Sequence, residues 1–165
     1  MVTEIHKEIQ TSIQEATSLE QVKEGLLSFL FEEKLHNPDL KIAYVSGIIT
    51  SDGPEHVERN IERLAWVTNE IRNEYPEYLV FSATDVFTNE VFERINAKDY
   101  PYHEWLAFWR KILTQSGISK VFMTPRWINS QGAWDEFKTA IKAGIETTYY
   151  IPLQYLPPDR SSQLP

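Results

Sequence analysis

The sequence predicts an α/β domain in which helices flank a mostly parallel sheet of four or five strands. Four short apolar segments, rich in β-branched and aromatic residues, are typical of strands. They alternate with longer segments whose apolar residues recur at the helical period, which indicates parallel strands joined by helical crossovers. The chain has 165 residues, 42% of them hydrophobic, and is long enough to bury one core.

The first part of the chain is predicted to be helical. Ile5, Ile9 and Ile13 recur at fourfold spacing, and Ser18 with Gln21 has the spacing of a capping box in front of a second apolar pattern. We therefore expect two helices before the first strand.

The sequence pattern predicts that the chain is divided into three parts. Residues 1–36 are expected to form an N-terminal helical extension that covers the sheet or a neighbouring subunit. The turn sequence at 37–39, Asn-Pro-Asp, begins the α/β domain, which is expected to run to residue 155. Residues 156–165 are polar and proline-rich, and we expect a flexible tail there.

The elements of the α/β domain follow in order. Strands are predicted at residues 40–46, 78–82, 119–124 and 145–151. Helices are predicted at residues 55–75, 102–115 and 131–143, with loop and a short helix in 86–101.

The two longer helices have recognisable faces. The helix at 55–75 carries a core-facing stripe made of Val57, Ile61, Leu64, Thr68, Ile71 and Tyr75. Trp66 is expected on the opposite face, where the N-terminal helices or a second subunit would cover it. In the helix at 102–115, Trp105, Trp109 and Ile112 share one face.

Charge and composition limit the partners. The chain has 24 acidic and 16 basic residues, a formal net charge of -8, which argues against binding a nucleic-acid polymer. A small ligand with one phosphate is compatible with this charge. The N-terminus lacks the apolar core of a signal peptide, and no apolar run is long enough for a bilayer. We expect a cytoplasmic protein that does not contact membranes.

Several kinds of catalytic site are not supported by the sequence. The chain has no cysteine, so thiol chemistry and cysteine-based metal sites are excluded, and its four histidines are scattered without metal-ligand spacing. The chain also lacks a dinucleotide-binding glycine motif, a phosphate-binding P-loop and a serine-hydrolase elbow. We expect no metal site and no organic cofactor.

Three loops are candidates for a binding site, because ligands of parallel sheets bind beyond the carboxyl ends of the strands. They follow Ser46, Ser82 and Thr124. The first strand ends in Tyr44-Val45-Ser46-Gly47, which offers hydroxyl and backbone N–H groups, although Gly47 is also explained as a turn residue.

Asp85 follows the second strand. Its carboxylate is suited to binding a sugar hydroxyl or to proton transfer. A helix cap or an Asx-turn is the alternative interpretation.

The third loop leads into the helix at 131–143. Asn129 or Ser130 can cap this helix, and Gly132 permits close approach of a ligand on the face that carries Glu136. The expected buried stripe is Ala133, Phe137, Ala140, Ile141 and Gly144. Glu136 lies roughly 60–80° from that stripe at 100° per residue. We expect it at the edge between sheet and solvent, within reach of a pocket. A capped helix with an ordinary solvated glutamate is the alternative.

Two of these segments together resemble the nucleoside 2-deoxyribosyltransferase-like superfamily, most strongly its bacterial and phage branch. The family's first strand ends in a Tyr-x-Ser-Gly-like turn, as at Tyr44-Val45-Ser46-Gly47. Its late motif, Pro-x-Trp-x-x-Ser-x-Gly-Ala-x-x-Glu, matches the segment from Pro125 to Glu136. The resemblance covers residues 40–151.

This resemblance implies a flavodoxin-like three-layer sandwich, dimeric or larger, that cleaves or transfers N-glycosidic bonds of nucleosides or nucleotides. It implies that Glu136 is the nucleophile, and Asp85 is the candidate for assisting the leaving base. The candidate substrate-binding residues are Tyr44, Ser46, Gly47, Trp127, Asn129, Ser130 and Gly132. A non-catalytic nucleotide-binding or protein-interaction module of the same fold is the alternative function.

Overall fold

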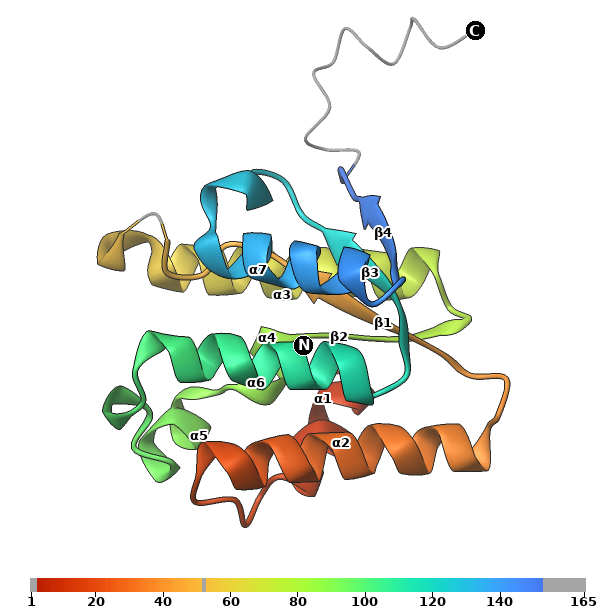
Figure 1. The fold of residues 1–165 in the computed structure, drawn as a ribbon, viewed down its shortest axis with the longest axis horizontal. Helices are drawn as coiled ribbons and strands as arrows, with labels where there is room; N and C mark the ends of the chain where they lie inside the picture. Colours follow the sequence, from red (N-terminus) through yellow and green to blue (C-terminus); the bar gives the residue numbers. More distant parts are fainter. Residues whose placement is uncertain (1–2, 52, 153–165) are drawn as a thin grey trace, which may run out of the picture.

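A four-stranded, all-parallel sheet lies at the centre of the molecule. The structure is a computed structural model and describes residues 3–51 and 53–152. The strands are β1 (Lys41–Ser46), β2 (Tyr78–Ser82), β3 (Ile118–Met123) and β4 (Glu146–Tyr149), in the spatial order β2-β1-β3-β4 (Figure 1). The predicted α/β class is confirmed, and the arrangement is consistent with a flavodoxin-like sandwich. The tail expected at 156–165 lies outside the described residues.

Helices occupy most of the remaining chain. The α-helices are α1 (Glu4–Ser12), α2 (Leu19–His36), α3 (Val57–Glu74), α4 (Ala83–Val86), α5 (Asn89–Arg94), α6 (Tyr102–Gln115) and α7 (Gln131–Lys142). Short 3₁₀ turns are η1 (Pro54–His56), η2 (Ala97–Asp99) and η3 (Trp127–Asn129). Among the described residues, no helix combines the length and apolar character needed to cross a membrane.

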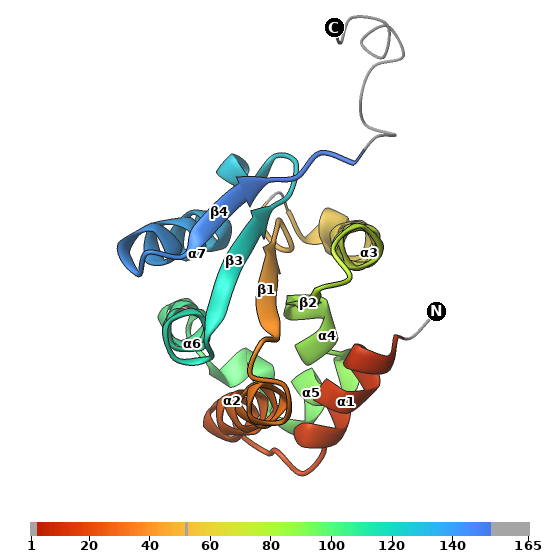
Figure 2. The same cartoon turned by 90° about the vertical axis from the view of Figure 1, so that its right-hand side faces the viewer.

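The sheet divides the molecule into layers, because alternate side chains of a strand point to opposite faces. On β1, Ala43 and Val45 pack into a smaller core that also contains Leu64 of α3. Ile42 and Tyr44 face the larger core on the other side of the sheet. Figure 2 shows α3 on one side of the sheet and α6 and α7 on the other, with α2 beside α6.

The N-terminal helices belong to the larger core. Ile9 of α1 and Leu26 of α2 are fully buried in the same cluster as Tyr44 of β1. Helix α2 begins at Ser18, whose hydroxyl accepts a hydrogen bond from the N–H of Gln21 at 3.2 Å, as the spacing predicts. The helices of residues 1–36 therefore cover the sheet of the same chain.

Two details of the helix faces differ from the prediction. Trp66 is half-buried and packs against the smaller core, so its predicted placement on the exposed face is wrong. In α7, Ile141 is 54% exposed, whereas Glu136 is buried. The helix is turned so that Ala133, Glu136 and Ala140 face inward, a spacing that apolar periodicity alone did not select.

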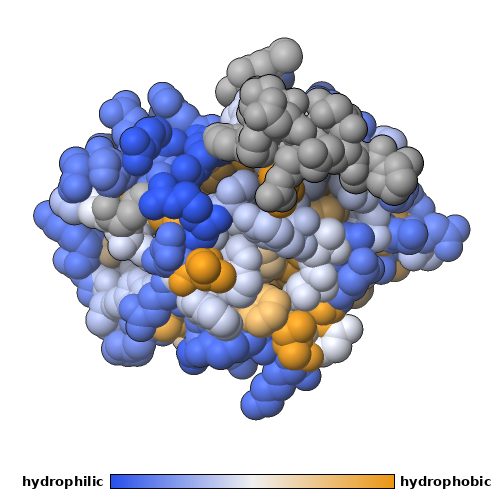
Figure 3. Space-filling view, turned by 90° about the horizontal axis from the view of Figure 1, so that it is seen from above, coloured by the Kyte–Doolittle hydropathy of each residue, from blue (hydrophilic) through white to orange (hydrophobic). Residues whose placement is uncertain are grey.

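Most of the exposed large apolar side chains lie in two regions, apart from Tyr102 of α6. Phe31 and Leu35 lie one turn apart on α2, and a second set, Ile128, Trp134, Ile141, Tyr149 and Ile151, comes from the segment around α7 and β4. Figure 3 shows one face of the molecule, on which hydrophobic residues form small groups among hydrophilic ones. Single exposed apolar residues are ordinary on a protein surface, whereas neighbouring ones form surfaces suited to self-association.

Candidate active site

A cavity of about 350 Å³ lies at the carboxyl ends of the strands. The three loops selected from the sequence meet there: Ser51 follows β1, Thr84 follows β2, and Ser130 precedes α7. Strands β2 and β3 lie on opposite sides of β1, so the strand order reverses at β1. Parallel sheets bind ligands at the carboxyl ends of the strands beside such a reversal. The volume suits a small organic ligand.

Glu136 of α7 is buried beside this cavity, with 7% of its surface exposed. The hydroxyl of Tyr44 donates a hydrogen bond to Oε1 of Glu136 at 3.1 Å, and the hydroxyl of Ser46 donates to Oε2. The expectation that Glu136 lies at the solvent edge is therefore wrong. Hydroxyls from β1 satisfy both carboxylate oxygens, which permits a position inside the protein.

Burial also changes the protonation of Glu136. The pKa of Glu136 is raised from 4.5 to about 7, and desolvation is the largest cause, since burial penalises the charged form. The hydrogen bonds from Ser46 and Tyr44 oppose this increase, and the charge of Asp135 adds to it. Burial also raises the pKa of Tyr44 well above its ordinary value, so its phenol remains a protonated donor. A carboxylate with this pKa changes its charge near neutral pH, as groups in functional sites often do.

The first strand places its residues for geometric reasons. Tyr44 and Ser46 are two positions apart, so their side chains leave the same face of the sheet. Tyr44 is held between the rings of Phe81 and Trp109, at centroid distances of 5.4 and 4.9 Å. This packing fixes the position of the hydroxyl that reaches Glu136.

Gly47 lines the cavity, and close packing explains the glycine. A Cβ at this position would lie 2.5 Å from Oγ1 of Thr124 and 3.1 Å from Cδ1 of Leu64. A larger residue would push β1 away from the loop after β3 or from α3, which are the elements that enclose the cavity.

Ser130 has the capping role that the sequence allowed for either Asn129 or Ser130. Its hydroxyl accepts hydrogen bonds from the N–H of Ala133 at 3.2 Å and from the hydroxyl of Ser51 at 3.3 Å. Ser130 and Gly132 line the cavity, and Tyr102 of α6 lies across from Gly132. Desolvation and the charges of Glu136 and Asp135 raise the pKa of Tyr102, which keeps this phenol neutral.

Three of the predicted substrate-binding residues are not among those that line the cavity. Ser46 is fully buried and contacts Glu136 instead. Trp127 packs against Trp134 and Phe137, with ring centroids 4.9 and 4.8 Å apart. Asn129 is exposed at the end of η3. Neither residue is among those that line the cavity. Their part of the motif stabilises the outer side of α7.

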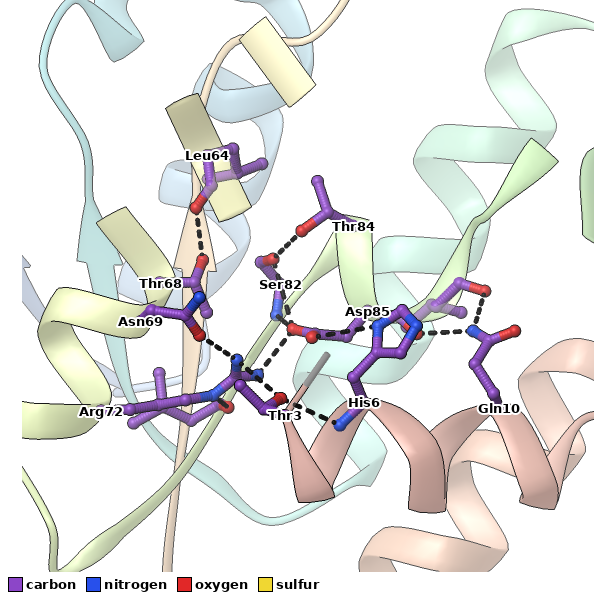
Figure 4. A network of polar contacts seen from close by, with 12 residues as sticks. Thr3, His6, Gln10, Leu64, Thr68, Asn69, Arg72, Ser82, Thr84 and Asp85 are labelled. Atoms are coloured by element: carbon purple, nitrogen blue, oxygen red, sulfur yellow. Dashed lines mark hydrogen bonds and ion pairs between the residues drawn. The ribbon is translucent and has the colours of Figure 1, made fainter. Parts of the chain in front are cut away.

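Asp85 lies in a separate polar network. Its carboxylate accepts hydrogen bonds from Nη2 of Arg72 at 2.8 Å and from the N–H of Ser82 at 2.9 Å, and it lies 3.5 Å from Nδ1 of His6 (Figure 4). Burial acts to raise the pKa of Asp85, but the hydrogen bond from His6 and the charge of Arg72 outweigh it and hold the pKa below its ordinary value. The structure does not bring Asp85 to Glu136.

This network joins α1 to the turn after β2. Gln10 of α1 donates hydrogen bonds to the carbonyl oxygens of Asp85 and Val86 at 2.6 and 3.0 Å, and Figure 4 shows Gln10 beside Asp85. The bond from the N–H of Ser82 to Asp85 also caps the first turn of α4. The geometry therefore corresponds to the helix-cap interpretation of Asp85.

The structure adds residues that sequence reasoning missed. An aromatic wall of the cavity is formed by Phe87, Phe92, Trp105 and Trp109. Trp105 meets Phe87 edge to face at 5.1 Å and Phe92 at 5.9 Å. The shared helix face of Trp105 and Trp109, together with an aromatic content of 13%, was the available signal.

Asp135 is a second carboxylate on the cavity wall that sequence reasoning missed. Arg110 binds it through two hydrogen bonds of 2.8 and 2.6 Å. The Arg110 side chain is about half exposed, so this pair lies at the border between cavity and solvent. No sequence pattern pairs residues 25 positions apart on different helices.

Within residues 3–51 and 53–152, no three His, Asp or Glu side chains are grouped to hold a metal ion. Comparisons of the chain with protein-family models, with curated proteins and with solved structures gave no match.

Proposed function

We propose that the protein cleaves or transfers the N-glycosidic bond of nucleosides or nucleotides, with Glu136 as the nucleophile. The observation that carries this proposal is a buried carboxylate, held by Tyr44 and Ser46, beside a cavity of about 350 Å³. The resemblance to nucleoside 2-deoxyribosyltransferase-like proteins points to the same residue.

The chemistry requires an ionised carboxylate near the anomeric carbon. As the bond from C1′ to the base nitrogen breaks, the sugar develops oxocarbenium character, and an oxygen of Glu136 forms a bond to C1′. The base leaves with the electrons of the broken bond and takes a proton from solvent. Water or a second base then attacks C1′ and releases Glu136.

Two hydroxyl donors prepare Glu136 for this role. They orient the carboxylate before the substrate binds and favour its ionised form against the effect of burial. A glutamate pointing into solvent would lack both constraints. The buried position therefore supports an enzyme over a non-catalytic module with the same fold.

The cavity walls suit the two halves of a nucleoside. The aromatic wall of Phe87, Phe92, Trp105 and Trp109 offers flat apolar surface to a base. Thr50, Ser51 and Ser130 also line the cavity, and their hydroxyls offer hydrogen bonds to a sugar.

The deciding experiment incubates the protein with a broad panel of nucleosides and nucleotides and follows free base by chromatography. We expect base release by the wild type and a loss of at least about a thousandfold in Glu136→Gln, as for removal of a covalent nucleophile. Glu62→Gln, an exposed carboxylate on α3, is the matched control and should retain activity. Base release by Glu136→Gln at the wild-type rate, or none by either protein, would refute the proposal.

We also propose that the protein acts in the cytoplasm as a homodimer or larger oligomer. The exposed apolar residues of α2 and of the α7–β4 segment provide surfaces that self-association would bury. Size-exclusion chromatography with light scattering should give at least twice the chain mass of 19.3 kDa. A single monomeric species at micromolar concentration would contradict the oligomer.

A further inference from the structure

The proposed reaction needs a group that stabilises the departing base. When the bond from C1′ to the base nitrogen breaks, its electron pair stays on the base, which then carries negative charge unless a donor reaches it. Glu136 forms its bond on the other face of C1′, so it does not serve the base. A hydrogen-bond donor on the base side of the cavity would lower the barrier to departure.

Tyr102 is the first residue of α6 and lies on the face of that helix that lines the cavity. The other lining residues of α6 are Trp105, Leu106 and Trp109, and their spacing places all four on one side of the helix. Trp105 and Trp109 belong to the aromatic wall that suits a base. Tyr102 is the member of this face that carries a hydroxyl, so it brings a polar group to the apolar surface beside the base.

Tyr102 and Glu136 border different ends of the cavity. Glu136 is 7% exposed and Tyr102 is 45% exposed, so the carboxylate lies at the buried end and the phenol at the end that meets solvent. A nucleophile attacks C1′ from the face opposite to the leaving group. A nucleoside whose C1′ lies against Glu136 therefore directs its base away from that carboxylate, toward α6 and Tyr102.

The hydroxyl of Tyr102 lies over the first turn of α7. A Cβ at Gly132 would lie 3.4 Å from this hydroxyl, and Gly132 itself lines the cavity. Gly132 is one turn before Glu136 on the same face of α7. The phenol thus extends from α6 toward the helix that carries the nucleophile, and its hydroxyl is at the cavity.

This hydroxyl is available to a ligand. The hydroxyls of Tyr44, Tyr100 and Tyr150 each have a hydrogen-bond partner in the protein. Within the part of the chain that the structure describes, 3–51 and 53–152, the hydroxyl of Tyr102 has none. Burial and the charges of two carboxylates raise its pKa, so the phenol stays protonated and donates a hydrogen bond without adding charge.

Other polar groups at the cavity are less suited to the base. Asp135 accepts two hydrogen bonds from Arg110, so it is an ionised acceptor and has no proton to offer. Ser51 and Ser130 are bonded to each other at the start of α7 and suit the sugar.

We propose that Tyr102 is a further catalytic residue, which donates a hydrogen bond from its phenol to the base as the base leaves. This inference rests on the proposed function and adds a residue to it. The bond from C1′ to the base nitrogen breaks, its electron pair goes to the base, and an oxygen of Glu136 forms the new bond to C1′. The phenol keeps its proton while it stabilises the charge, and the base then takes a proton from water.

Tyr102→Phe tests this role, because it removes the hydroxyl and keeps the ring. We expect kcat/KM for base release to fall about 10- to 100-fold, the value of one hydrogen bond to a charged group. Tyr149→Phe, which removes the hydroxyl of an exposed tyrosine on β4, is the matched control and should retain the wild-type rate. A wild-type rate in Tyr102→Phe would overturn the proposal.

A leaving-group series separates assistance to the base from an effect on cavity shape. The series uses one sugar with bases of increasing acidity, namely 5-halogenated uracils and N7-methylated purines, the latter leaving without negative charge. A base that leaves easily needs no donor, so the deficit of Tyr102→Phe should shrink to about twofold for the best leaving groups. An equal deficit across the series would mean that Tyr102 shapes the cavity, and the proposal would fail.

The same assays distinguish failure of this inference from failure of the proposed function. If the wild type releases no base from any compound, the proposed function fails and the role of Tyr102 falls with it. If the wild type is active, Glu136→Gln is inactive and Tyr102→Phe matches the wild type, the role of Tyr102 alone fails. Thermal unfolding of Tyr102→Phe should match that of the wild type, which assigns a lower rate to lost chemistry rather than to lost fold.

Discussion

The phenolic oxygen of Tyr44 lies 3.1 Å from Oε1 of Glu136, although the two residues are 92 positions apart in the chain. One comes from the first strand and the other from the last helix. The contact ties the nucleophile of the proposed reaction to the sheet. Because Tyr44 is itself packed among aromatic rings, the donor cannot move far without disturbing the core.

Tyr44→Phe should weaken the proposed reaction with little change in fold. The phenyl ring fills the same space, but Oε1 of Glu136 loses its donor, so the ionised form is less favoured and the pKa of Glu136 rises above about 7. We expect kcat below pH 7 to fall about tenfold, the value of one hydrogen bond to a charged group. Steady-state rates across pH measure this effect.

The control for Tyr44→Phe is Tyr149→Phe, because Tyr149 is exposed on β4. Its pH profile should match that of the wild type. An unchanged profile in Tyr44→Phe would show that the contact does not control the ionisation of Glu136.

The wild-type pH profile should itself report the state of Glu136. A nucleophile must be ionised, and the pKa of Glu136 is about 7. Activity is therefore expected to increase tenfold per pH unit below that value and to level off above it. If activity instead declines as pH rises through 7, Glu136 acts as a proton donor. Rates measured at constant ionic strength from pH 5 to 9 distinguish these outcomes.

Glu136 should destabilise the folded protein at alkaline pH. Its folded pKa of about 7 exceeds the ordinary 4.5, so the folded state binds this proton more tightly than the unfolded state. The resulting stabilisation is complete below pH 4.5 and is lost as pH rises through 7. The shift in pKa corresponds to a loss of about 3 kcal/mol in the free energy of unfolding.

Glu136→Gln does not lose stability as pH rises, because its amide does not ionise and both hydroxyls can still form hydrogen bonds to it. Its stability relative to the wild type should therefore increase by up to about 3 kcal/mol between pH 4.5 and pH 8. Urea unfolding at the two pH values provides the measurement, with Glu62→Gln as the exposed control. A difference that does not depend on pH would mean that the carboxylate is not buried in solution.

Asp85→Asn is expected to affect stability more than chemistry. The variant leaves Arg72 without its carboxylate partner in a largely buried place, and breaking such a pair costs about 3 kcal/mol. Denaturant unfolding should show this loss of stability. The pH profile of base release should remain the same as that of the wild type. The additional change Arg72→Met, which removes the unpaired cation, should recover part of the stability.

The competing role for Asp85 predicts a different result. If it assists departure of the base, as the sequence suggested, Asp85→Asn would lower kcat and alter the alkaline side of the pH profile.

Asp85 should also affect how stability depends on pH. Because the Asp85 pKa is held below its ordinary value, the stabilisation by Asp85 is present above that value and disappears as pH falls through the lowered folded pKa. Acid unfolding of wild type and variant should therefore converge at low pH.

Much of the fold was predictable because it depends on local patterns. Each predicted strand overlaps an observed one, and the helices at 55–75, 102–115 and 131–143 occur within a few residues of their expected bounds. The parallel sheet then follows from the alternation of elements, and its carboxyl edge gathers the three candidate loops. Local capping at Ser18 and Ser130 also follows from the spacing of side chains.

The site was less predictable, because its chemistry depends on contacts across the chain. Apolar periodicity assigned Ile141 to the core and Glu136 to the edge, yet Ile141 is exposed and Glu136 is buried. The hydroxyls that permit this burial come from β1. Asp85 likewise follows a strand as expected, but its carboxylate contacts His6 and Arg72 and lies away from the cavity. Neither partner is close to Asp85 in the sequence, so no local pattern predicts these contacts.

The sequence by itself determined the order of the elements and the sheet edge where the candidate site lies, and its resemblance to a known family made Glu136 the first candidate residue. The tertiary structure alone decided the protonation of Glu136, the separation of Asp85 from it, and the acidic, aromatic character of the cavity. The division has a physical cause. Hydrophobic period and capping act over a few residues, whereas desolvation and charge depend on every group that folding brings near.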